Sequence, residues 1–281
     1  MLIAQISDPH ISIPGGRMDR AYATASHLQR AVAHLNALGP RPDVVLATGD
    51  LVDAGDVEEY RRLRALLAPL QMPVFLIPGN HDAREPLLAV FADHAYLPRD
   101  GGFLQYAVED YPVRLLALDT LVPGESGGEL CAERLAWLDT GLAEAPDRPT
   151  VVFMHHPPFR TGLNKMDEMG LAGGEDLARV IRRYGNVEAI LCGHIHRPIT
   201  RRFAGTVAIV CPGTAHQIAL DLRGGKRLAA VMEPPACMLH QWQGPDGGLV
   251  SHLSYIGAGC PPFELFDGRR WKNAEPPFGE R

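Results

Sequence analysis

The sequence predicts an α/β protein with a largely parallel or mixed sheet, helices on its outside, and a second, mainly antiparallel sheet. Two observations predict this class. Over the first 200 residues, short apolar runs alternate with amphipathic segments of helical period, an order typical of such sheets. From Arg201 onward the pattern changes to short strands separated by glycine and proline, with no further long helix.

The elements of the first part follow in a clear order. An apolar run predicts a strand over Leu2–Ile6, and apolar residues at helical spacing predict a helix from Asp19 to Leu38. Gly39-Pro40 closes that helix. The run Asp43–Ala47 predicts a buried strand. An amphipathic helix is expected over Val57–Leu70, and the next strand over Val74–Ile77.

Later elements and three sections of the chain complete this interpretation. Further strands are expected over Val113–Leu118, Val151–Met154 and Ala189–Cys192, and further helices over Cys131–Ala143 and Asp176–Tyr184. Residues 1–215 are expected to form the core, and 216–260 to supply C-terminal strands that complete the second sheet and contact other subunits. Residues 261–281 are rich in proline and are expected to form an extended tail.

The composition is that of a globular protein. Hydrophobic residues make up 46% of the 281 residues and charged residues 21%, which excludes intrinsic disorder, collagen-like sequence and coiled coil. The length fits one large domain or two modest ones. The net charge of −6 argues against a partner such as a nucleic acid polymer, whose backbone needs a positive surface.

Cysteine usage and the N-terminus bear on the cellular compartment. The five cysteines are spread widely without a CxxC pair, which favours reduced thiols over a disulfide framework or a zinc knuckle. The apolar run at the N-terminus is too short for a signal peptide, and no stretch of 18 apolar residues could form a membrane span. We therefore expect a cytoplasmic protein.

Polar residues of metal-binding type stand where several predicted strands end. Sites in open α/β sheets gather at the carboxyl ends of strands. Mixed nitrogen and oxygen ligands favour divalent Zn, Mn, Co or Fe over Ca or Mg. The residues at these ends are Asp8, His10, Asp50, Asn80, His81, Asp82, His155, His156, His194 and His196.

The number of these groups indicates two metal ions rather than one. Two ions that share a bridging carboxylate, roughly 3.5–4 Å apart, can bind both free oxygens of a phosphoryl group and hold a hydroxide for in-line attack. Gly49, Gly79 and Gly193 precede ligands at sharp turns, where a side chain would hinder close approach of the backbone. No GxSxG elbow or phosphate-binding GxxxxGK[ST] loop competes with this chemistry.

Five sequence blocks, DPH, GDLVDAGD, GNHD, HHPP and GHIH, occur in an order that resembles the calcineurin-like metallophosphoesterases. The resemblance spans residues 1–215. The longer segments GDLVDAG, IPGNHD, MHHPPF and GHIHR are most similar to the branch of class III cyclic nucleotide phosphodiesterases and glycerophosphodiesterases. It implies a four-layer αββα sandwich with two mixed sheets and a dinuclear centre of divalent or trivalent metal ions.

The resemblance also implies a role for each matching residue. One metal ion would be held by Asp8, His10 and His196, and the second by Asn80, His155 and His194, with Asp50 bridging the two. His81 would lie near the leaving oxygen or a phosphate oxygen. His81, Asn80 and Asp50 are therefore the expected catalytic residues.

Several neighbouring residues have simpler interpretations. Asp53 and Asp82 are expected to cap turns or to orient ligand imidazoles. His156 is expected to support His155, which has the spacing of the family's ligand. His216 either reaches the rim of the site or is an ordinary loop histidine, while His240 receives no role.

We expect a dinuclear-metal phosphodiesterase acting on small phosphodiesters of the cyclic nucleotide or glycerophosphodiester type. A phosphomonoesterase or nucleotidase would use the same two ions, and a non-catalytic scaffold would keep only the fold. Such scaffolds typically lose several ligands, whereas all seven positions are filled here. The predicted partners are a small phosphodiester substrate and further copies of the chain in a homodimer or higher oligomer, with no membrane.

Overall fold

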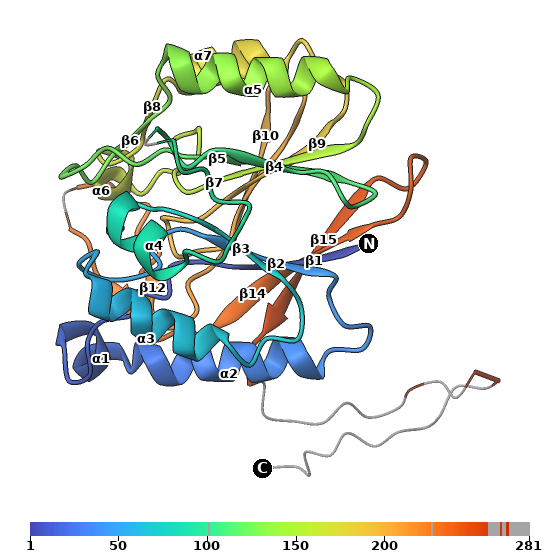
Figure 1. The fold of residues 1–281 in the computed structure, drawn as a ribbon. Helices are drawn as coiled ribbons and strands as arrows, with labels where there is room; N and C mark the ends of the chain where they lie inside the picture. The colour runs from blue at the N-terminus through green and yellow to red at the C-terminus, as the bar shows by residue number, and fades with distance from the viewer. Residues whose placement is uncertain (101, 226, 258–264, 266–267, 270–281) are drawn as a thin grey trace.

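Two β-sheets pack face to face, and helices cover the outer side of each sheet (Figure 1). The computed structural model describes residues 1–281 except 101, 226, 258–264, 266–267 and 270–281. Residues of both sheets, such as Ile3 and Val151, belong to one buried apolar cluster between the layers. The four-layer αββα sandwich is thus confirmed. Within the described residues, no helix has the length and apolar character that a membrane crossing requires.

The first sheet has the strand order β15-β14-β1-β2-β3. Strands β1, β2 and β3 are parallel, and β14 runs antiparallel to β1. Helices α2 and α3 lie along its outer face (Figure 1). The strands are β1 Leu2–Ile6, β2 Val44–Thr48, β3 Val74–Ile77, β14 Ala236–Trp242 and β15 Leu249–Tyr255. The helices of this part are α1 Arg17–Tyr22, α2 Thr24–Ala37, α3 Val57–Leu67 and α4 Arg84–Val90.

The second sheet has the order β10-β11-β9-β7-β5-β4 and is mixed, with β5, β7, β9 and β11 parallel. Helices α5 and α7 cover its outer face (Figure 1). Its strands are β4 Tyr106–Val108, β5 Arg114–Leu118, β7 Thr150–Met154, β9 Val187–Cys192, β10 Ile199–Phe203 and β11 Thr206–Val210. The helices here are α5 Ala132–Glu144, α6 Asn164–Asp167 and α7 Gly174–Ile181. Two short ribbons pair β6 Gly128–Glu129 with β8 Leu171–Ala172, and β12 Gln217–Ile218 with β13 Ala230–Val231.

The prediction of one helix from Asp19 to Leu38 is wrong, because the helix is broken at Ala23. That residue has the left-handed backbone angles φ 49° and ψ 42°, and it separates α1 from α2. Alanine is a strong helix former, so helical periodicity gave no sign of the break.

The prediction that the strands after Arg201 form a mainly antiparallel second sheet, completed by residues 216–260, is also wrong. Strands β10 and β11 join β9 in the second sheet, whereas the hairpin of β14 and β15 completes the first sheet beside β1. The buried residues Ala236, Cys237 and His240 of β14 fit against that free edge. Alternating polarity predicts a strand but not which strand lies next to it. Most of the predicted tail at 261–281 lies outside the described residues.

Candidate metal centre

The fold gathers all seven predicted ligands at one edge of the two sheets. They follow the carboxyl ends of β1, β2, β3, β7 and β9. Backbone hydrogen bonds fix these ends together, since Asp8 N donates to Gly49 O at 3.1 Å and Gly193 N donates to His155 O at 2.9 Å. The seven residues are Asp8, His10, Asp50, Asn80, His155, His194 and His196.

The first half of the centre consists of Asp8, His10 and His196, and all three are buried. His10 Nε2 lies 3.1 Å from His196 Nε2, which in turn lies 3.3 Å from Asp8 Oδ1. His196 Nδ1 donates to His216 O at 3.1 Å, so its Nε2 carries the free lone pair. Two imidazole nitrogens and a carboxylate that converge in a buried space form a fitting site for a cation.

The second half consists of Asn80, His155 and His194. His155 Nε2 lies 3.2 Å from Asn80 Oδ1, while its Nδ1 donates to Thr48 O at 2.8 Å. His194 Nε2 donates to Met169 O at 3.0 Å and leaves Nδ1 as its free ligand atom. Backbone acceptors thus set the tautomer of both rings, as is usual for metal-binding histidines.

Asp50 lies between the two halves. Its Oδ1 is 3.3 Å from His155 Nε2, and its Oδ2 is 3.6 Å from His10 Nε2. Burial raises the pKa of Asp50, but the imidazoles of His155 and His10 outweigh this effect and hold the pKa well below its ordinary value. An ionised carboxylate with one oxygen toward each half has the arrangement of a bridging ligand.

The backbone at the ligands is strained. Five of the seven ligand positions are non-glycine residues in the left-handed region, with φ between 43° and 71°. This conformation costs about 1–3 kcal/mol at each such residue and concentrates at functional sites. The loops therefore hold the ligands in fixed directions through the backbone itself. The five residues are Asp8, His10, Asp50, His194 and His196.

Glycine is required at the turns before the ligands. A Cβ at Gly79 would collide with the backbone nitrogen and Oδ1 of Asp50, and one at Gly49 would collide with the ring of His155. Gly49 also has a φ of 87°, which disfavours other residues. The predicted close approach of the backbone at these turns is confirmed.

Asp82 and His156 support the ligands, as the sequence predicted. The carboxylate of Asp82 accepts hydrogen bonds from Gly79 N at 2.8 Å, Leu51 N at 3.0 Å and Tyr60 Oη at 2.8 Å, which fixes the loops after β2 and β3. His156 accepts from Thr120 Oγ1 at 2.8 Å and donates through Nε2 to Ser126 O at 3.3 Å. Both of its ring nitrogens are engaged, so the geometry favours His155 as the ligand.

His81 lies on the solvent side of the first half. Its ring meets that of His10 edge to face with centroids 4.7 Å apart, and 39% of its side chain is exposed. His81 Nδ1 donates to Asp53 O at 2.7 Å, so Nε2 is free to face a bound molecule. Asp53 thus orients His81 through its backbone carbonyl.

His216, for which the sequence left two interpretations, reaches the site. Its ring centroid lies 4.7 Å from that of His196 and 5.6 Å from that of His10. The ring of His216 also stacks on that of Tyr22, with the two centroids 4.2 Å apart. Sequence reasoning missed Tyr22, because only the helix break at Ala23 places it there and no residue pattern marks that break.

Sequence reasoning also missed Gln5, whose buried amide joins the two sheets beneath the ligands. Gln5 Nε2 donates to Thr48 Oγ1 at 3.0 Å and to Cys192 O at 2.9 Å. Its Oε1 accepts from His240 Nε2 at 3.1 Å, and His240 Nδ1 accepts from Ser251 Oγ at 2.7 Å. An amide at an inward position of the apolar strand LIAQI was the signal that could have indicated this role.

The fold and this centre define the class of the protein, which belongs to the calcineurin-like phosphoesterases. The model of that family matches residues 1–198. The cofactor of the family is a pair of metal ions, and the convergent buried ligands of this chain fit such a pair without fixing the identity of the metals. The chain is accordingly a hydrolase.

Two curated relatives cover nearly the whole chain. A protein of Arcobacter nitrofigilis named probable glycerophosphodiester phosphodiesterase is 37% identical, over 95% of this chain and 97% of its own length. A protein of Rhodopseudomonas palustris named probable cyclic nucleotide phosphodiesterase is 38% identical, over 95% of this chain and 97% of its own. The crystal structure of a dimetal phosphatase from Danio rerio covers 91% of this chain and 99% of that one with a TM-score of 0.62. At 16% identity this last likeness supports the fold alone.

Proposed function

We propose that the protein is a dinuclear-metal phosphodiesterase that hydrolyses small phosphodiesters of the cyclic nucleotide or glycerophosphodiester type. The observation that carries this proposal is the position of Asp50, with one carboxylate oxygen toward His10 and the other toward His155. A shared carboxylate sets two metal positions close enough to act on one phosphoryl group. The two relatives that cover the chain support a diester substrate.

The chain supplies positioning and a proton donor. When bound, the two metal ions supply Lewis acid charge at the phosphoryl oxygens and activate water at neutral pH. Asp8, His10 and His196 hold the first position, and Asn80, His155 and His194 hold the second. His81 lies on the solvent side of the first half with its Nε2 free, and as an imidazolium it would donate a proton from Nε2 to the departing oxygen.

An activity panel tests this function. Protein reconstituted with Mn or Co is assayed on bis(p-nitrophenyl) phosphate, cyclic AMP and a glycerophosphodiester, with p-nitrophenyl phosphate as the monoester. We expect diester hydrolysis to exceed monoester hydrolysis. A reversed ratio would favour a phosphomonoesterase or nucleotidase, and inactivity on every diester despite full metal content would contradict the proposal.

We also propose that the protein is cytoplasmic and forms a homodimer or higher homo-oligomer. Large apolar side chains are exposed around the ribbon of β12 and β13, including Leu220, Leu222 and Met232, which are 60%, 64% and 54% exposed. These residues are close in sequence to the two strands of that ribbon, and contiguous exposed apolar surface favours a protein contact. Light scattering of the full chain is expected to give at least twice the chain mass, and a monomer at micromolar concentration would contradict this part.

A further inference from the structure

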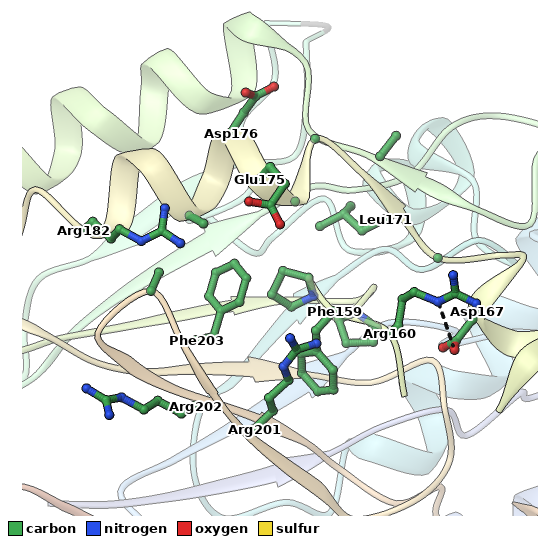
Figure 2. A pocket seen from close by; sticks show the side chains of 18 of the residues that line it. Phe159, Arg160, Asp167, Leu171, Glu175, Asp176, Arg182, Arg201, Arg202 and Phe203 are labelled. Carbon is green, nitrogen blue, oxygen red and sulfur yellow. Dashed lines mark ion pairs between the residues drawn. The ribbon is translucent and has the colours of Figure 1, made fainter. Parts of the chain in front are cut away.

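A cavity of about 900 Å³ lies between the edge strand β10, helix α7 and the loop after β7, separate from the seven ligands (Figure 2). This volume is at the upper end for pockets that hold small organic ligands. Arg201 and Phe203 face it from β10, Arg182 and Glu175 line it from the region of α7, and Phe159 lines it from the loop. Arg202 belongs to the lining, but its side chain points away from those of Arg201 and Phe203.

The acidic residues of the cavity wall already have partners, with one exception. Asp167 accepts from Thr161 N and Gly162 N and lies 3.6 Å from Arg160. Glu168 pairs with Lys165, and Asp176 with Arg179. Glu175 is the wall carboxylate for which the described residues provide no ion pair.

Three arginines of the wall, in contrast, are not neutralised. Arg182, Arg201 and Arg202 have no ion pair within the described part of the chain. All three are exposed, so water screens the repulsion between them, and a bound anion would gain mainly from direct hydrogen bonds to their N–H groups. Arginine binds phosphate through two parallel N–H groups and is well suited to this role.

Aromatic rings accompany these charges. Phe203 is buried, Phe159 is half-buried, and the guanidinium of Arg201 lies 5.5 Å from the centroid of the Phe159 ring. Rings of this kind provide stacking surfaces for a flat base, and arginine beside a ring adds attraction.

We propose that this cavity binds a nucleotide, with its phosphate on arginines of the wall, its base against the half-buried Phe159, and a ribose hydroxyl donating to Glu175. A carboxylate that accepts from ribose is a common device of nucleotide sites. The site goes beyond the proposed phosphodiesterase function and does not depend on it.

The cavity is adjacent to the metal centre but does not include it. Pro157 of its wall follows His156 directly, and Gly170 follows Met169, whose carbonyl accepts from His194. Nucleotide bound here is therefore distinguishable from nucleotide bound at the metals, since only the latter requires metal ions.

Calorimetric titration of the full chain with adenosine 5′-monophosphate tests the proposal, both metal-loaded and with EDTA present. We expect binding that persists in EDTA. The double substitution Arg182→Ala with Arg201→Ala should weaken it about tenfold or more, because charge-assisted contacts to phosphate are lost. The single substitution Arg201→Gln should also weaken nucleotide binding. It replaces the double variant in the test if the double variant does not fold. Inorganic phosphate and adenosine, titrated separately, should each bind at least about tenfold more weakly than the nucleotide.

The matched control is Arg61→Ala, which removes an exposed arginine on α3 that pairs with Glu58 and does not line the cavity. Its affinity should equal that of the unmodified chain. Nucleotide binding that disappears in EDTA would overturn the proposal, as would equal affinities for the cavity variants and the control. Equal affinities would instead match a role of Arg201 and Arg202 in protecting the edge of the sheet.

Discussion

The two halves of the metal centre differ in charge and in burial. The first half has a carboxylate of its own, Asp8, which is fully buried. In its place the second half has the neutral amide of Asn80, which is half-buried. Both share Asp50, so the first position carries one more negative charge, which attracts a cation strongly in a buried site. Strand ends that meet at one edge can therefore form two metal positions of unequal charge. We expect the metal ion in the first position to bind more tightly.

The strongest test of this comparison is Asp8→Ala. It removes the only carboxylate that belongs to the first half alone. Replacing residues that merely orient ligands costs 10–100-fold in affinity, so loss of this ligand should weaken the first metal ion by at least about 100-fold. Elemental analysis and turnover of bis(p-nitrophenyl) phosphate measure the effect. Asp93→Asn, at an exposed carboxylate that pairs with Arg64, is the control. Unchanged occupancy in Asp8→Ala would disprove the assignment.

The next test is Asn80→Ala in the second half. We expect metal content to fall from two ions toward one per chain, and turnover to fall by at least about tenfold. The melting temperature of the metal-free protein should change little, since the side chain is half-buried and has one ring partner. Should the lost ion prove to be the tighter of the two, the ranking of the halves would be reversed.

Gln5→Leu is expected to affect both halves equally. The amide of Gln5 binds Thr48 at the end of β2 and the carbonyl of Cys192 at the end of β9. The loops after these two strands carry ligands of both metal positions. We expect about tenfold weaker binding of each ion and a free energy of unfolding lower by about 1–3 kcal/mol, because buried partners lose their hydrogen bonds. Gln241→Leu, at an exposed position of β14, is the control. Loss of one ion alone would show that Gln5 supports a single half.

The last test concerns His240, which lies behind Gln5 and outside both halves, so we expect no direct effect on metal binding. Burial, with a contribution from His252, lowers its pKa to about 3. Below the ordinary value of about 6.5 the unfolded chain binds a proton that the folded chain does not, so stability falls as the pH drops from 6.5 toward 3. His240→Gln should reduce this slope by up to about 1.4 kcal/mol per pH unit. Urea denaturation at several pH values measures it, and equal slopes in both proteins would contradict the expectation.

The sequence allowed prediction of the strand ends and of the residues that follow them, because alternating apolar runs and polar blocks are local features. His155 and His194 could be placed near each other, since carboxyl ends of parallel strands meet at one edge. The tautomers of their rings could not be predicted. They depend on the carbonyls of Thr48 and Met169, which are distant in the chain.

The errors arose where the decisive contact is non-local. The break at Ala23 has no glycine or proline to mark it, and its visible consequence is the stacking of Tyr22 on His216. The sequence of the C-terminal hairpin predicts two strands but not the sheet that they join. Only the pairing of β14 with β1 shows that they belong to the first sheet. His240 therefore received no role, although it lies opposite Gln5 in the folded protein.

The pairing of β1 with β14 has a consequence for synthesis of the chain on the ribosome. Strand β1 can pair with β2 soon after both emerge, but its other edge remains open until residues 236–242 have been made. An open strand edge is prone to aberrant pairing during this interval. The strand that leads to Asp8 and His10 is thus made long before β14, and it acquires its full set of neighbours only when that later strand has been added.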